Sequence, residues 1–287
     1  MKKYFFLIFF TILALCGICI YQYLSFHDGK LHVIFCNVGQ GDGIVIRTPG
    51  GSILVNDSGP DNSIVTCLNH HLPFWERGIA ITLLTHPHAD HLNGFLPLFG
   101  RFSVENFITE RLTNKTAGYS ELYKLLNKQH VPIHYAISGN TFSIGQVHVR
   151  IIGPTQQFLD ATSPNGIIGE SKEFASLETL ITYGNFSVIL DGDSQVDELT
   201  DAIRNNAIHS VTVLQIPHHG SRTGTSWDVL STLKPQLAVI SVGLHNRYGH
   251  PHRETMQLLQ QSRTKLLRTD QNGDVEIISD GRNWEAR

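Results

Sequence analysis

The sequence predicts one mixed α/β domain, built from two packed β-sheets with helices outside them, behind a single N-terminal membrane anchor. A long apolar segment without a formal charge opens the chain. Hairpin patterns dominate the first half of the remainder, whereas strand alternates with helix in the second half. The 287 residues show no clear break between independent domains and no internal repeat. A chain of this length can bury one large core.

The N-terminal segment has the features of a signal anchor. Two lysines precede an apolar run from residue 4 to about residue 26. This run is close to the roughly 20 residues that span a bilayer, and it exceeds a usual signal-peptide core. The charge after the run is small, because Asp28 offsets Lys30, so the lysines favour a cytoplasmic N-terminus and an exported body. We expect an uncleaved anchor over residues 1–27 and a single folded domain over residues 28–287.

Cysteine usage leaves two alternatives open. Cys16 follows Leu13-Ala14-Leu15, which resembles a lipobox except that Leu15 occupies the position of a small residue, so lipidation is an alternative to the anchor. Cys36 and Cys67 could pair outside the cytoplasm or remain free buried thiols. No Cys-x-x-Cys pair occurs in the body, which excludes a structural zinc ribbon.

Composition and charge describe a globular protein without a general attraction to nucleic acid. Hydrophobic residues make up 41% of the chain and charged residues 16%, with a formal net charge of −3. A nucleic-acid substrate would therefore depend on a local basic patch or on metal ions for its electrostatics.

The first half of the body predicts short strands that are separated by turns at 39–43 and 49–51 and by helices. Strands are expected at 31–36, 44–47, 52–56, 79–84, 104–109, 132–136 and 147–152. Helices are expected at 62–71, 92–99 and 119–129.

The second half begins with a polar segment at 156–174, which predicts a long loop of the kind that is often functional. Strands are then expected at 177–183, 186–190, 211–216, 236–242, 265–268 and 274–278. Helices are expected between them at 195–205, 226–233 and 253–261.

A cluster of metal-ligand residues follows the strand at 79–84. Residues 85–91 read Thr-His-Pro-His-Ala-Asp-His. Neutral imidazoles and carboxylates are the ligands that borderline divalent metals prefer. His86 and His88 point the same way in extended backbone, so both can reach one ion. Asp90 and His91 follow where the chain turns and can hold a second ion.

Other chemical groups also stand at the ends of predicted strands, which brings them to one edge of a sheet. Asp191-Gly192-Asp193 could equally be an ordinary acidic turn. His218-His219 is harder to explain by packing alone. His250 lies between Gly and Pro and is expected in a turn. Asp57 could orient a histidine ligand, or it could be a plain turn carboxylate.

Taken together, these segments resemble the metallo-β-lactamase superfamily, and specifically the soluble hydrolase domain of the ComEC family of DNA-internalisation competence proteins. The resemblance covers about residues 31–279. Its motifs are Val38-Gly39-Gln40-Gly41-Asp42, Asp57-Ser58-Gly59, Thr85-His86-Pro87-His88-Ala89-Asp90-His91, Gly192-Asp193, Pro217-His218-His219-Gly220-Ser221, Asn246-Arg247-Tyr248-Gly249-His250-Pro251, and Arg268-Thr269-Asp270 with Gly273.

The resemblance implies a four-layer αββα sandwich with two divalent metal ions, zinc or manganese, on one edge. It implies that His86 and His88 bind the first ion, that Asp90, His91 and His219 bind the second, and that Asp193 bridges them. In this class a hydroxide shared by the metals attacks a phosphorus or carbonyl centre. His250 would contact the oxyanion or protonate the leaving group. Asp42, Asp57 and His218 would support the ligands.

Three departures from the family pattern stand out. No third histidine for the first ion lies between His91 and Asp193, and Glu173 stands where an asparagine is expected. Asn37 replaces the aspartate that usually precedes the Val-Gly-Gln-Gly-Asp motif. The family also carries a multi-helix membrane channel, so DNA transport would require a separate channel protein.

The resulting functional hypothesis is an extracytoplasmic, membrane-anchored metal-dependent phosphodiesterase or nuclease that acts on DNA, with single-stranded DNA as a candidate substrate. One alternative is a hydrolase of a phosphorylated envelope component, an ester or a lactam. A second alternative is a non-enzymatic, metal-stabilised module in DNA uptake or envelope assembly.

Overall fold

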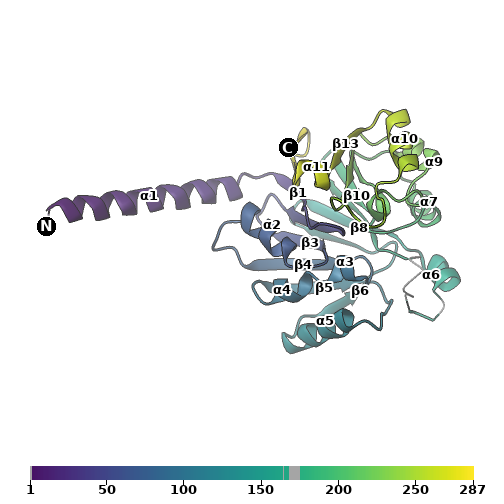
Figure 1. Ribbon diagram of the computed structural model, residues 1–287, viewed down its shortest axis with the longest axis horizontal. Helices are drawn as coiled ribbons and strands as arrows, with labels where there is room; N and C mark the ends of the chain where they lie inside the picture. Colours follow the sequence, from purple (N-terminus) through teal and green to yellow (C-terminus); the bar gives the residue numbers. More distant parts are fainter. Residues whose placement is uncertain (1, 164, 168–174) are drawn as a thin grey trace.

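Two β-sheets pack face to face, and helices cover their outer faces (Figure 1). The computed structural model describes residues 2–163, 165–167 and 175–287. The N-terminal helix α1 (Lys2–Phe26) extends away from the sheets, and residues 6–26 of it are long and apolar enough to cross a membrane, with a mean hydropathy of 2.1. This agrees with the predicted apolar anchor segment.

The first sheet has eight strands in the order β15-β14-β1-β2-β3-β4-β5-β6. Pairing is antiparallel from β15 to β3 and parallel from β3 to β6. Its strands are β1 (Leu31–Phe35), β2 (Gly43–Arg47), β3 (Ile53–Ser58), β4 (Gly78–Leu84), β5 (Ser103–Thr109), β6 (Ile133–Tyr135), β14 (Val275–Ser279) and β15 (Trp284–Ala286).

The second sheet has seven strands in the order β13-β12-β11-β10-β9-β8-β7. Pairing is antiparallel from β7 to β10 and parallel from β10 to β13. Its strands are β7 (Thr141–Ile144), β8 (Val147–Gly153), β9 (Glu178–Tyr183), β10 (Phe186–Leu190), β11 (Val213–Gln215), β12 (Leu237–Ile240) and β13 (Lys265–Arg268). The alternation of strand and helix in the second half thus produces the parallel part of this sheet.

Strand periodicity divides the apolar residues between the two faces of each sheet. In β1, Leu31, Val33 and Phe35 are buried in the core between the sheets, whereas Ile34 packs in the core that the outer helices cover. The central strands are apolar on both faces because both faces are buried.

The helices surround this sandwich. Besides α1 they are α2 (Ser63–His71), α3 (Ala89–Leu92), α4 (Phe95–Phe99), α5 (Ala117–Lys128), α6 (Gln156–Thr162), α7 (Val196–Asn205), α8 (Pro217–Gly220), α9 (Trp227–Leu233), α10 (Arg253–Ser262) and α11 (Thr269–Asn272). The four layers therefore match the predicted αββα arrangement.

Two sequence-based expectations were wrong. The expected loop at 156–174 begins with α6, because the Thr155 hydroxyl caps the Phe158 N–H and Leu159 buries its side chain against Leu112 and Ala175. The single helix expected at 92–99 is divided into α3 and α4. It breaks at Gly94, whose N–H donates to the Gly59 carbonyl oxygen at 2.9 Å.

The cysteine alternatives are resolved for the body of the protein. Cys36, directly after β1, and Cys67 in α2 form a disulfide, with Cα atoms 5.9 Å apart. Cys16 and Cys19 are exposed free thiols on α1.

Candidate metal centre

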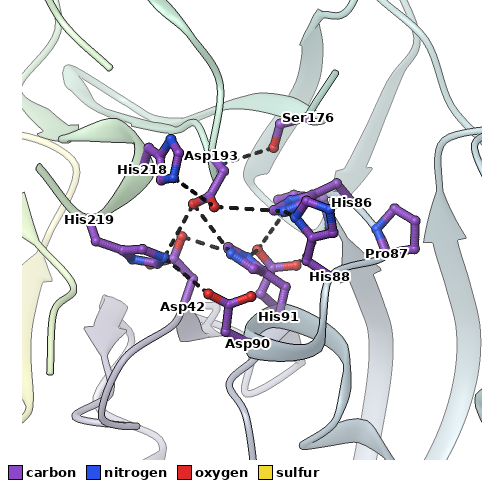
Figure 2. A network of polar contacts seen from close by, with 12 residues as sticks. Asp42, His86, Pro87, His88, Asp90, His91, Ser176, Asp193, His218 and His219 are labelled. Atoms are coloured by element: carbon purple, nitrogen blue, oxygen red, sulfur yellow. Dashed lines mark hydrogen bonds and ion pairs between the residues drawn. The ribbon is translucent and has the colours of Figure 1, made fainter. Parts of the chain in front are cut away.

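The predicted ligand residues converge where strand ends of the two sheets meet (Figure 2). His86 and His88 lie in the turn after β4, and Asp90 and His91 begin α3 directly after it. Asp193 follows β10 in the opposite sheet. The loops after parallel strands thereby deliver ligands from both sheets to one edge of the sandwich.

One group of ligand atoms consists of His86, His88 and Asp193, which lie within 4.8 Å of one another. His86 Nε2 is 2.9 Å from His88 Nδ1 and 3.8 Å from Asp193 Oδ2. Both imidazoles come from a single turn, as the i, i+2 spacing predicts.

The second group consists of Asp90, His91, Asp193 and His219, again within 4.8 Å of one another. Asp193 Oδ1 lies 3.3 Å from both His91 Nε2 and His219 Nε2, and His219 Nε2 lies 3.6 Å from Asp90 Oδ2. Asp193 therefore presents one oxygen to each group.

The donor atoms of the second group fit a bound cation. His91 Nε2, His219 Nε2 and Asp193 Oδ1 are buried, and none makes a hydrogen bond to any residue that the structure describes. Leaving such atoms unsatisfied is expensive in a protein interior. A divalent ion that prefers nitrogen and oxygen ligands would satisfy all three.

Hydrogen bonds on the outer side of the ligands set the orientation of two histidine rings. His91 Nδ1 donates to Asp57 Oδ2 at 2.9 Å, and His219 Nδ1 donates to the carbonyl oxygen of Ser241 at 3.0 Å. Each Nε2 then directs its lone pair into the site. Asp57 is itself held by the backbone and hydroxyl of Thr85, at 2.8 and 2.7 Å.

Two glycines allow the chain to approach the ligands closely. Gly41 has a φ of +141°, and a Cβ there would stand 2.2 Å from the Asp90 carbonyl oxygen. Gly192 has a φ of +53°, and a Cβ there would stand 2.3 Å from Ser176 Oγ. Only glycine fits either position, which explains its place in both motifs.

The charges within the site favour the ligand forms of Asp193 and His86, whereas an ion at His91 and His219 would have to displace a proton. Burial lowers the pKa values of these two rings, but Asp193 outweighs it, raising the pKa of His91 well above its usual value and that of His219 to about 9. Burial alone would raise the pKa of Asp193, but His219, His91 and His218 hold the pKa of that carboxyl well below its usual range. Burial, reinforced by His91, lowers the pKa of His86 well below its usual value, so this imidazole is neutral. A carboxylate and a neutral imidazole are the forms that bind metal.

Asp42 lies behind the second group. Its carboxylate oxygens are 3.6 Å from His219 Nδ1 and 3.8 Å from His91 Nδ1. Burial raises the pKa of Asp42 to about 6. Asp42 thus lies beside two predicted ligands, His91 and His219, but is not one of the four residues of the second group.

His218 and His219 point to opposite oxygens of Asp193, because both residues adopt left-handed backbone with φ of 52° and 55°. His218 Nε2 lies 3.7 Å from Oδ2, whereas His219 Nε2 faces Oδ1. The amide nitrogen of Gln195 lies 3.0 Å from His218 Nδ1 and 3.3 Å from the Asp193 carbonyl oxygen. The structure thus includes His219, and not His218, in the second group.

A cleft of about 400 Å³ opens over the ligands. His250 lies half-buried in its wall, with its ring 5.5 Å from that of His218 and 6.2 Å from that of His219, measured between centroids. Asp90, Asp193 and Arg247 also line the cleft.

Some residues of the site were not identified from sequence. Gln195 and Ser241 hold the rings of His218 and His219, respectively. Neither Ser241 nor Gln195 belongs to a recognisable sequence motif. Their contacts with the two histidines depend on how the chain folds locally. Glu173 lies outside the described residues, and Asn37 is exposed, with its N–H donating to Asp274 Oδ1 at 2.7 Å.

The two helix-covered sheets, with a His/Asp site at their common edge, define a protein of the metallo-β-lactamase fold. The metallo-β-lactamase fold protein YhfI from Bacillus subtilis superposes with a TM-score of 0.58 at 12% identity, covering 87% of this chain and 100% of its own. The metallo hydrolase Igni18 from Ignicoccus hospitalis gives a TM-score of 0.54 at 14% identity, covering 85% and 98%.

Sequence comparison points to competence and recombination proteins, although no family model matches the chain. The chain is 24% identical over 273 residues to Competence protein ComA of Neisseria gonorrhoeae, covering 93% of this chain and 35% of that protein. The chain is 27% identical over 274 residues to ComE operon protein 3 of Bacillus subtilis, covering 90% of this chain and 34% of that protein. It is 26% identical over 272 residues to Recombination protein 2 of Haemophilus influenzae, covering 93% and 31%. The predicted resemblance is confirmed, and the chain spans about a third of the length of these relatives.

Proposed function

We propose that this protein is a membrane-anchored, metal-dependent phosphodiesterase that acts on DNA during its uptake. The observation that carries the proposal is the pair of His/Asp groups that share Asp193 at the floor of an open cleft. Two adjacent cation sites suit a phosphodiester, whose charge must be balanced on both the attacking and the leaving side.

In this proposal His86, His88 and Asp193 would hold the first ion. Asp90, His91, His219 and Asp193 would hold the second. Zinc and manganese both fit these nitrogen and oxygen donors. Bound there, the ions would supply Lewis acidity, which activates water and stabilises negative charge on phosphoryl oxygens.

The protein's own groups would orient the substrate and the ligands. Asp57 fixes the ring of His91, and Asp42 lies beside both His91 and His219. Burial lowers the pKa of His250 to about 4, so its ring is neutral near neutral pH. A neutral His250 on the cleft wall can donate a hydrogen bond to a phosphoryl oxygen or to the departing oxygen.

We place the domain at 28–287 outside the cytoplasm, anchored by residues 1–27. Lys2 and Lys3, which precede the apolar run of α1 in the sequence, support this orientation. The Cys36–Cys67 disulfide supports an oxidising compartment. The name of one relative, Competence protein ComA, supports a role in DNA uptake, which would require a separate membrane channel as partner.

The test is turnover of bis-p-nitrophenyl phosphate by the full chain in detergent, with manganese or zinc supplied. We expect metal-dependent release of nitrophenol that is lost in Asp193→Ala. Asp197→Ala changes an exposed carboxylate four residues further along and is the matched control, expected to keep activity. Absence of turnover with both metals would refute the proposal, and hydrolysis of nitrocefin instead would identify a lactam substrate.

A further inference from the structure

One rim of the cleft carries an aromatic ring and a guanidinium that no structural role accounts for. Tyr248 is 49% exposed although it lines the cleft beside the predicted ligands. Its ring is nearly parallel to that of His250, at 23° with centroids 5.8 Å apart. Arg247 places its guanidinium carbon 5.0 Å from the Tyr248 ring centroid and donates to the phenol oxygen at 2.9 Å.

The loop that presents this pair is rigidly held by Asn246. The side-chain amide of Asn246 donates to the carbonyl oxygens of Gly243 and His250 at 2.9 and 2.7 Å. Its oxygen accepts from the backbone N–H groups of Tyr248 and His250 at 3.2 and 3.0 Å. An exposed aromatic side chain on a pre-organised loop loses little entropy when a planar group stacks on it.

Another part of the cleft wall continues along α5. Asn114 and Thr116 line the cleft, and the same two residues line a neighbouring cavity of about 450 Å³. Asn114 also donates to the Pro87 carbonyl oxygen at 2.9 Å, which ties this wall to the turn that carries His86 and His88.

The neighbouring cavity combines positive charge with aromatic surface. Lys115 and Lys124 line it together with Tyr119 and Tyr123. Lys115 is exposed. Lys124 is 71% exposed, and its ion pair with Glu121, at 3.5 Å, lies at the surface. Lysines interleaved with aromatic rings are the pattern by which proteins hold single-stranded nucleic acid.

We infer that a single-stranded polynucleotide binds along this path, with one unpaired base stacked on Tyr248 and its phosphates at Arg247 and at Lys115 and Lys124. A base in a duplex is already stacked and paired, so Tyr248 selects for an unpaired strand. The local lysines and arginine supply an attraction that the net charge of −3 does not. This inference deepens the proposed function and rests on it for the position of the scissile phosphodiester.

Binding is measured by fluorescence anisotropy, using the full chain in detergent and a labelled oligothymidylate of about 12 nucleotides, with EDTA to prevent cleavage. We expect Tyr248→Ala to weaken binding by about 5- to 100-fold and Tyr248→Trp to retain it. Replacing Lys115 and Lys124 together by alanine should reduce the slope of log affinity against log salt by about 1 to 1.5.

Phe74→Ala is the matched control. Phe74 is 63% exposed, and it lines neither the cleft nor the neighbouring cavity. This variant should bind the oligonucleotide like the wild type. An abasic oligonucleotide of the same length should bind wild type and Tyr248→Ala equally, because no base is available to stack.

The inference is overturned if Tyr248→Ala binds like Phe74→Ala, or if a duplex of equal length binds as tightly as the single strand. These outcomes are separable from the test of the proposed function. If the protein hydrolyses bis-p-nitrophenyl phosphate but binds the oligonucleotide equally well without Tyr248, only the binding path is refuted. Tyr248-dependent binding without any turnover would refute the phosphodiesterase and leave the binding path standing.

Discussion

Several acidic side chains lie fully buried close to the candidate metal centre. Glu198 accepts the backbone N–H of Ser176, whose hydroxyl in turn accepts the backbone N–H of Asp193. Burial raises the pKa of Glu178 to about 8, and burial also raises the pKa values of Asp191 and Glu198 well above their usual range. These groups therefore hold protons near neutral pH, and they limit the negative charge behind Asp193.

Replacing Glu178 by glutamine should alter the pH dependence of stability. Between about pH 4.5 and pH 8 the unfolded chain has lost this proton while the folded chain keeps it, so stability falls as pH rises, by at most about 1.4 kcal/mol per pH unit. Glu178→Gln removes this contribution and should flatten the slope of the free energy of unfolding, measured by denaturant titration from pH 5 to about 8. The exposed Glu105→Gln is the control, and an unchanged slope in Glu178→Gln would refute the assignment.

The individual ligands were more predictable than the residues that orient them. His86, His88, Asp90 and His91 lie within a six-residue span, so their convergence follows from short-range geometry. Asp193 and His219 were identified by their place after predicted strands. Gln195 and Ser241 could not be, because their contacts depend on the left-handed turn at 218–219, which sequence patterns do not encode.

At the scale of elements, the disulfide joins the end of β1 to α2 across the β2–β3 hairpin. Cys36 and Cys67 enclose a sequence separation of 31 residues, and both side chains are buried in the core under the outer helices. Asp57, which holds His91, lies in β3 of this hairpin. The disulfide therefore constrains the hairpin that carries Asp57, the residue that orients the ring of His91.

Replacing both cysteines by alanine should lower the free energy of unfolding by about 3–4 kcal/mol, because the unfolded chain loses a closed loop of this length. Denaturant titration of the Cys36→Ala/Cys67→Ala protein measures the loss, and a reductant should reproduce it in the wild type. The free thiols offer a matched control, since Cys16→Ala/Cys19→Ala should leave stability unchanged. Equal stability of both double variants would show that the cross-link contributes nothing.

Long periodic elements were predicted correctly, whereas some short ones were missed. The hairpin of β2 and β3 and the helices α2, α5 and α7 follow from alternation and from amphipathic spacing. The four-residue strand β13 was predicted at 265–268, but β7 and β15, with four and three residues, were not predicted. Helix α6 was missed because its stability comes from one cap and one buried leucine rather than from periodicity.

At the scale of the whole molecule, the ligands come from both sheets of the sandwich. His86, His88, Asp90 and His91 follow β4 in the first sheet, whereas Asp193 and His219 follow β10 and β11 in the second. Ions bound between these groups would link the two sheets at their common edge. Ion binding is then coupled to the packing of the sandwich as well as to chemistry.

Metal should therefore stabilise the folded protein, and this stabilisation should depend on the bridging carboxylate. An ion at 100 times its dissociation constant adds about 2.7 kcal/mol if it binds only the folded state. We expect manganese or zinc to raise the midpoint of thermal unfolding of the full chain and EDTA to reverse the rise. Asp193→Ala should unfold at the same temperature with and without metal, because both groups lose a shared ligand, whereas the exposed Asp197→Ala should respond like the wild type. A metal-dependent shift that persists in Asp193→Ala would mean that the ions do not join the two sheets through this residue.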